Sequence, residues 1–182
     1  VLARVTVDVP QPQVTINTRR DTSVTGSMVV DLDAVAAPET VRNFLTYVSS
    51  ALYRNTIFHR VIKDVLIQGG GYTAGPTVVT GLRAPIVLES DNGLKNVRGT
   101  IAMARNSIFD SATSQFYLNI ADNVDFDFVD AERRGYAVFG RVVSGLDVLD
   151  AIGNVPTVAR DTGVFANLPV TDVVVTSITQ TR

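Results

Sequence analysis

One histidine and one arginine lie side by side in the segment FHRVIKDVLIQGGGYT, residues 58–73, and both side chains can carry chemistry. His59 is the only histidine of the chain, so a hydrolase with a Ser-His-Asp triad would have to use it. No G-x-S-x-G elbow accompanies His59 to support such a triad. Arg60 is a permanently charged donor that can stabilise a developing lone pair. Neighbouring side chains of a strand point to opposite faces, so we expect His59 to be a hydrogen-bonded scaffold residue.

The glycine and aspartate clusters indicate turns rather than phosphate or metal sites. The run from Gly69 to Gly71 matches neither phosphate-binding glycine pattern, so it predicts a positive φ or a close backbone approach. With no cysteine and one histidine, the usual zinc sites are excluded. The aspartates at 122, 125, 127 and 130 lack the glycine and closing glutamate of an EF-hand, which favours a solvated loop and no metal.

The composition is that of a globular domain without a nucleic-acid or membrane signature. Of the 182 residues, 46% are hydrophobic and 19% are charged, which leaves room for a sizeable core. The formal net charge of -2 gives no general attraction to nucleic acid. No apolar run reaches the roughly 18 residues that a membrane span needs.

Short β-branched segments bounded by glycine, asparagine or aspartate recur along the chain and predict strands. The predicted strands cover residues 14–17, 28–32, 58–62, 66–69, 101–104, 116–120, 137–143 and 170–179. Such a succession of short strands is typical of an antiparallel barrel or sandwich.

Two segments have helical periodicity instead. Residues 37–53 repeat apolar side chains every third or fourth position, with Pro38 suited to the first turn. In residues 144–154, Ser144 could cap the helix and Gly153 could end it. Because the helices do not alternate with the strands, the pattern predicts a mainly β barrel with a helix at each end.

The first thirteen residues are predicted to be an N-terminal arm. Val5, Val7 and Val9 alternate with polar residues as in a half-buried strand, and PQPQ at 10–13 predicts an extended connector. Residues 14–182 contain no linker, repeat or low-complexity stretch, so we expect them to form one domain.

Three motifs, FHR…QGG, GTIAMAR…SATSQF and GYAVFG, occur in this order. Together they closely resemble the cyclophilin family of peptidyl-prolyl cis/trans isomerases, especially its bacterial type, from about Val14 to the C-terminus. The resemblance implies a closed eight-stranded antiparallel β-barrel capped by two α-helices. It also implies a shallow groove that binds an extended Xaa-Pro segment, and no cofactor.

The chemistry of this reaction needs no nucleophile. Rotation of a prolyl amide breaks the partial C–N double bond against a barrier of roughly 18–20 kcal/mol. The enzyme therefore only has to favour the twisted amide over the planar one. In the twisted state the proline nitrogen recovers a lone pair, which can accept a hydrogen bond from a fixed, charged donor.

The resemblance assigns roles to residues that match the family motifs. Arg60 in FHR matches the catalytic arginine, and Gln68 in IQGG matches the residue that orients this arginine and the substrate carbonyl. Gln115 in SQF matches a substrate-binding glutamine, and residues 104–106 lie where a strand pairs with the bound peptide. These last three residues are Ala104, Arg105 and Asn106.

The resemblance also implies an apolar cup for the proline ring, and some of its positions differ from the usual residues. The positions read Val65, Leu66, Tyr117 and, by spacing, Phe126. Tyr136 matches a further family position, where eukaryotic relatives have a histidine and tyrosine fits the bacterial type. Val65 replaces a phenylalanine, and the lost contact is expected to cost of order 1–3 kcal/mol. The hydroxyl of Tyr117 needs a partner. The chain has no tryptophan, on which the family's affinity for cyclosporin depends, so we expect weak cyclosporin binding.

The sequence therefore predicts a prolyl isomerase that acts on proline-containing segments of unfolded or flexible chains and assists folding. The alternative is a proline-peptide binding or chaperone module whose altered cup has lost most of its turnover. The start at Val1, the absence of cysteine and the polar arm favour an exported, periplasmic bacterial protein. A cytoplasmic location is the alternative.

Overall fold

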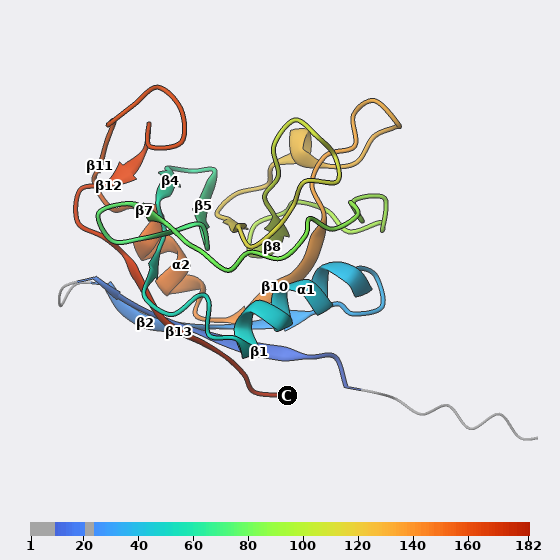
Figure 1. Cartoon of the computed structure of the whole chain (residues 1–182), viewed down its shortest axis with the longest axis horizontal. Coiled ribbons are helices and arrows are strands. Elements are labelled where there is room, and N and C mark those ends of the chain that lie inside the picture. Colours follow the sequence, from blue (N-terminus) through green and yellow to red (C-terminus); the bar gives the residue numbers. More distant parts are fainter. Residues whose placement is uncertain (1–9, 21–23) are drawn as a thin grey trace, which may run out of the picture.

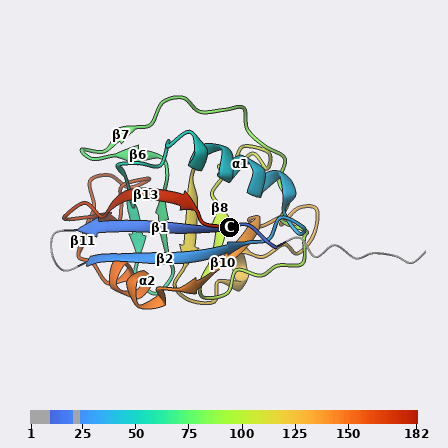
Figure 2. The ribbon, with the colours of Figure 1, turned by 90° about the horizontal axis from the view of Figure 1, so that it is seen from below.

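The structure is a computed structural model of the chain, and it describes residues 10–20 and 24–182. Its main feature is a strongly curled antiparallel sheet with a helix on either side of the central strands (Figures 1 and 2). The predicted arm falls largely on residues 1–9, which lie outside the described residues. Of its remaining part, Gln13 already opens the first strand, and Leu32 donates its backbone N–H to the carbonyl of Pro12.

Eleven described strands pair into the main sheet, in the order β4-β5-β9-β8-β10-β2-β1-β13-β3-β6-β7. They are β1 (Gln13–Arg20), β2 (Val24–Leu32), β3 (Thr56–Ile57), β4 (Arg60–Ile62), β5 (Leu66–Gly69), β6 (Tyr72–Thr73), β7 (Thr77–Val78), β8 (Thr100–Met103), β9 (Phe116–Asn119), β10 (Val138–Ser144) and β13 (Val174–Gln180). Two further strands, β11 (Thr157–Val158) and β12 (Leu168–Pro169), form a separate antiparallel pair.

The mainly β fold with two helices is confirmed, whereas a closed eight-stranded barrel is not. The paired order has two ends, β4 and β7, so the hydrogen-bonded sheet is open over the described residues. The strand predicted at 58–62 begins only at Arg60, and Phe58 and His59 form a two-residue link between β3 and β4. β4 is the strand at one end of the sheet, whereas β3 lies near the other end. Because a short link joins β3 to β4, the sheet must curl so that its two ends come close together.

The two predicted helices are present as α1 (Pro38–Ser49) and α2 (Leu146–Gly153). Pro38 occupies the first turn of α1 as expected, and the carboxylate of Glu89 accepts N–H groups from that turn. The predicted cap of α2 is wrong: Ser144 ends β10, and Gly145, with a φ of 88°, is the N-cap. A left-handed residue turns the chain sharply from strand into helix, which favours glycine there.

The apolar side chains form two clusters. The larger fills the curl of the sheet and includes Phe44 of α1, Phe116 of β9 and Phe139 of β10. The second, termed the small apolar cluster, consists of Leu66, Ala102, Tyr117 and Val138, with Ile62, Val65, Leu94, Ala104, Phe126 and Tyr136 packed against them. Among the described residues, no helix is long and apolar enough to cross a membrane.

Candidate active site

Arg60, Gln68 and Gln115 line one pocket of about 620 Å³ and are linked by side-chain hydrogen bonds. Arg60 donates from Nη1 to Oε1 of Gln68 over 3.4 Å, and Gln68 donates from Nε2 to Oε1 of Gln115 over 2.9 Å. The sheet register explains the first contact, because Arg60 of β4 lies directly opposite Gln68 of β5. These three residues, predicted together from separate motifs, therefore meet in one chain of contacts.

Arg60 keeps donor capacity beyond this chain of contacts. Its Nε is buried and makes no hydrogen bond within the described part of the protein. A guanidinium has five N–H donors, and among the described residues the contact with Gln68 uses one of them, at Nη1. The pocket beside Arg60 is therefore suited to a molecule that presents a hydrogen-bond acceptor to the guanidinium.

The glycine run brings Gln115 close to the backbone. A Cβ on Gly71 would lie 2.6 Å from Cδ of Gln115, so only glycine leaves room for this side chain as placed. Gly70 has a φ of 82°, and a Cβ there would lie 2.7 Å from the carbonyl oxygen of Ser114. Both functions predicted for the run, positive φ and close approach, are thus present.

The rim formed by residues 104–106 differs in detail from the prediction. β8 ends at Met103, so these residues extend beyond the strand, although all three line the pocket. Arg105 uses its side-chain N–H groups on the carbonyls of Gly135 and Asn106. Its guanidinium also lies 4.7 Å from the ring centroid of Tyr136. These hydrogen bonds hold the rim to the neighbouring loop at Gly135.

The predicted cup residues gather beside the pocket rather than in its lining. The four cup residues Val65, Leu66, Tyr117 and Phe126 belong to the small apolar cluster, and so does Tyr136. Phe126 packs edge-on against Tyr117 and Tyr136 at 6.1 Å and 5.5 Å between ring centroids. Leu66 and Tyr117 are almost fully buried. Ala104 belongs to both the cluster and the pocket lining, so the two regions meet there.

The hydroxyl of Tyr117 has the partner that its position requires. It donates to Oδ1 of Asn96 over 2.7 Å, in a buried setting. Asn119 donates to the same oxygen over 3.3 Å and to Oγ1 of Thr100 over 2.8 Å. Burial raises the pKa of Tyr117 well above its ordinary value, and nearby Tyr136 adds to the shift. The phenol of Tyr117 therefore stays neutral and acts as a hydrogen-bond donor to Asn96.

His59 is a buried scaffold residue, as predicted, but the hydrogen bond expected of it is not well formed among the described residues. The side chain is fully buried, its ring lies 4.6 Å from that of Tyr72, and neither nitrogen has a well-formed hydrogen bond in the described chain. Burial, and then the charge of Arg60, lower its pKa from 6.5 to about 4, although a polar contact with the Ile57 backbone opposes the shift. A buried, neutral imidazole without a bonded serine cannot serve a hydrolytic triad.

The pocket also contains residues that the sequence did not single out. Ser111 and Thr113 lie inside the SATSQF motif region and could have been included with Gln115. Residues 162–164 also line the pocket, but they come from the loop between β11 and β12, which carries no recognised motif. Their place depends on tertiary folding.

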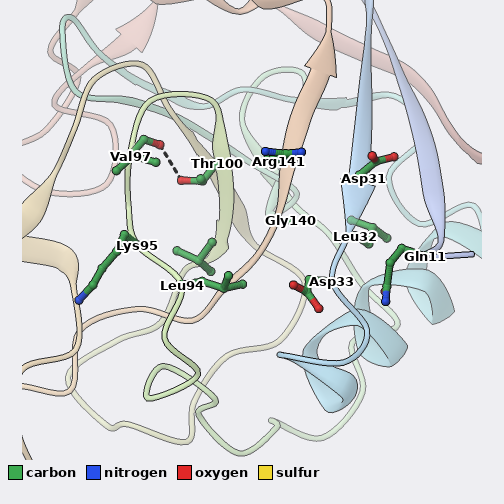
Figure 3. Close-up of a pocket in the computed structure, with 11 residues that line it drawn as sticks. Gln11, Asp31, Leu32, Asp33, Leu94, Lys95, Val97, Thr100, Gly140 and Arg141 are labelled. Carbon is green, nitrogen blue, oxygen red and sulfur yellow. Dashed lines mark hydrogen bonds between the residues drawn. The ribbon is translucent and has the colours of Figure 1, made fainter.

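A second pocket, of about 410 Å³, lies between the ends of β2 and β10 and the loop at 94–100 (Figure 3). Its carboxylates are already used within the protein: Asp31 accepts from Gln13, and Asp33 accepts from the backbone of Ala36. Lys95 pairs with Asp127 at 3.6 Å. In the described part of the chain, no group of three histidine, cysteine or acidic residues is arranged to hold a metal.

Comparison with known proteins shows which family the chain resembles. The family described as cyclophilin type peptidyl-prolyl cis-trans isomerase/CLD matches residues 13–180. Peptidyl-prolyl cis-trans isomerase A of Dickeya dadantii is 46% identical over 158 residues, which cover 86% of this chain and 80% of the relative. Peptidyl-prolyl cis-trans isomerase B of Escherichia coli is 44% identical over 156 residues, covering 85% and 93%.

Solved structures agree on the fold. A cyclophilin type peptidyl-prolyl cis-trans isomerase of Cryptosporidium parvum superposes with a TM-score of 0.75 at 23% identity, over 94% of this chain and 98% of that one. A second structure of that protein, in the presence of the dipeptide Ala-Pro, gives a TM-score of 0.71 at 25% identity, over 91% and 96%.

Proposed function

The chain belongs to the cyclophilin type peptidyl-prolyl cis-trans isomerases, and on this basis we propose a role for each part of its site. Arg60 stabilises the twisted prolyl amide, Gln68 and Gln115 position Arg60 and the substrate, and the small apolar cluster receives the proline ring. The observation that carries this proposal is the chain of hydrogen bonds from Arg60 through Gln68 to Gln115, three residues that line one pocket.

Arg60 is the catalytic residue of this proposal. As the Xaa-Pro amide twists, the proline nitrogen changes from a conjugated atom to a hydrogen-bond acceptor. A guanidinium donor held beside it gains a hydrogen bond that the planar ground state does not offer, so it lowers the barrier selectively. No covalent bond forms or breaks, and no proton moves.

Gln68 and Gln115 limit the freedom of the donors. The contact from Nε2 of Gln68 to Oε1 of Gln115 leaves the amide N–H groups of Gln115 for a substrate carbonyl. The contact from Arg60 to Gln68 restrains the guanidinium. Donors that are already oriented need little reorganisation when the amide twists.

The proposed substrates are exposed proline-containing segments of unfolded or flexible chains. The Cryptosporidium parvum neighbour, solved in the presence of Ala-Pro, supports a small proline-containing ligand for this fold. Ala104 joins the pocket to the small apolar cluster, so a chain in the pocket can place its proline against Val65 and Phe126. Both side chains are partly exposed.

Two-dimensional exchange NMR on a short Ala-Pro peptide tests this assignment. We expect catalysed cis/trans exchange from the parent and a loss of about 100-fold or more from Arg60→Ala, because electrostatic stabilisation is usually the largest catalytic contribution. Arg54→Ala, a change at an exposed arginine outside the pocket, is the matched control. Full exchange by Arg60→Ala would refute the role of Arg60, and peptide binding without exchange by the parent would indicate a binding module.

Cyclosporin binding is proposed to be weak. The chain contains no tryptophan, and Val65 offers less apolar surface than the phenylalanine expected at its position. Titration of the exchange activity with cyclosporin should require concentrations well above stoichiometric. Complete inhibition at nanomolar, near-equimolar concentrations would contradict the proposal.

A further inference from the structure

The loop between β11 and β12 forms a wall of the pocket that lies outside the motifs of the sequence. Thr162, Gly163 and Val164 line the same pocket as Arg60 and Gln115. Figure 1 shows this loop, at residues 159–167, beside β4. A chain segment that crosses Arg60 therefore passes the loop as well.

The loop is held in shape by its own hydrogen bonds. Oδ1 of Asp161 accepts the backbone N–H groups of Gly163 over 2.9 Å and of Phe165 over 2.8 Å. The backbone N–H of Arg160 donates to the carbonyl of Phe165 over 3.0 Å, which closes the turn. Val164 therefore lies between two residues that the same carboxylate fixes.

The loop is also anchored to the strand that carries the catalytic arginine. The ring of Phe165 packs edge-on against Tyr72, with 5.0 Å between centroids, and lies 6.4 Å from the ring of His59. The N–H of Val61, next to Arg60, donates to the carbonyl of Asn167 over 2.9 Å. His59 and Val61 flank Arg60 in sequence, so the loop packs against the residues on both sides of the catalytic arginine. A wall supported in this way needs little ordering when substrate binds.

We propose that this loop is a specificity wall, in which Val164 selects an apolar side chain next to the substrate proline. The inference rests on the proposed function. Residues 162–164 carry no charge, and Val164 leaves 45% of its surface exposed. The small apolar cluster meets the pocket at Ala104, so a proline in the cluster places a flanking residue in the pocket. An aliphatic side chain there covers Val164, whereas a polar one gains nothing from it.

The expected preference is modest because the wall is open to solvent on one side. Burial of one or two methylene groups against Val164 corresponds to about a three- to tenfold difference in kcat/KM between a leucine and a serine next to proline. The preference appears at only one of the two flanking positions, since the loop lies on one side of Arg60. It adds to whatever selectivity the small apolar cluster has for proline itself.

Exchange NMR on a peptide series tests the proposal, with glycine, serine, valine or leucine placed before or after the proline. In the parent, one flanking position should favour leucine over serine, and Val164→Ser should reduce that ratio to near one. Val143→Ser is the matched control, because Val143 of β10 is similarly exposed, at 44%, and lies outside the pocket. Val143→Ser should keep the parent ratio.

The outcomes separate this inference from the proposed function. If the parent exchanges the glycine-flanked peptide but Val164→Ser leaves the leucine-to-serine ratio unchanged, the specificity wall is wrong and the isomerase assignment stands. An equal loss for all peptides in Val164→Ser also overturns the wall, because it indicates a general disturbance. If the parent exchanges none of the peptides, the proposed function fails, and the inference fails with it.

Discussion

Nε2 of Gln68, on β5, donates a hydrogen bond over 2.9 Å to Oε1 of Gln115, the residue just before β9. Oε1 of the same Gln68 side chain accepts a hydrogen bond from Nη1 of Arg60. The side-chain amide of Gln68 therefore restrains both the guanidinium of Arg60 and the side chain of Gln115. This arrangement makes the two glutamines a unit whose contributions depend on each other.

A double-mutant cycle should reveal that dependence. Gln68→Leu and Gln115→Leu should each lower kcat/KM by about tenfold, which corresponds to about 1.4 kcal/mol. The double variant should lose less than the product of the two effects, because either change already breaks the shared contact. Exchange NMR supplies the rates, and strictly multiplicative losses would show that the contact does not couple the residues.

Gly71→Ala should impair activity with little effect on stability. The new Cβ would lie 2.6 Å from Cδ of Gln115, and the flexible glutamine can move away at low cost but then leaves its place beside Gln68.

Gly70→Ala should give the contrasting result, a loss of stability. The positive φ of Gly70 and the Ser114 carbonyl oxygen at 2.7 Å from the new Cβ should lower the unfolding free energy by about 1–2 kcal/mol or more. Urea denaturation and exchange rates measure both effects. An active Gly71→Ala variant would contradict the steric argument.

The sequence predicted the repeating elements well because local patterns determine them. Apolar spacing and Pro38 located α1, and β-branched runs located most strands of the sheet. The break at Phe58 and His59 and the open ends of the paired order were missed. These features depend on how distant strands meet, which alternation within one segment does not encode.

The residues that line the pocket could be predicted where they lie in motifs, but not where only folding brings them together. Arg60, Gln68 and Gln115 were each identified from a motif, and they share one pocket. The loop at 162–164 lies in that pocket without any motif of its own. His59 was predicted to be a hydrogen-bonded scaffold residue from strand alternation with Arg60, but His59 lies outside the strands and packs against the rings of Tyr72 and Phe165.

Tyr117→Phe should lower stability more than activity. The hydroxyl donates to buried Asn96 over 2.7 Å, and its removal leaves that oxygen with only the longer contact from Asn119. The unfolding free energy should fall by about 1–2 kcal/mol, whereas kcat/KM should change by less than about twofold because the ring remains. Paired urea denaturation and exchange NMR provide the comparison. A large loss of activity at unchanged stability would place the hydroxyl in substrate binding instead.

His59 should make the protein less stable as the pH falls below about 6.5. Burial lowers its pKa from 6.5 to about 4, so between these values the unfolded chain binds a proton that the folded chain excludes. The contribution of neutral His59 is therefore complete above pH 6.5 and declines by about 1.4 kcal/mol per pH unit on acidification toward pH 4. Urea denaturation between pH 7.5 and pH 5 should show the decline, before most carboxylates titrate.

His59→Phe is the control for this pH dependence, because it keeps an aromatic ring against Tyr72 and Phe165 but removes the titrating group. The variant should show a nearly flat unfolding free energy from pH 7.5 to pH 5, whatever its absolute stability. The chain has no other histidine, so no second imidazole can mask the result. An equally steep decline in the variant would assign the acid sensitivity to groups other than His59, and a flat profile in the parent would show that the folded protein accepts the proton on this ring.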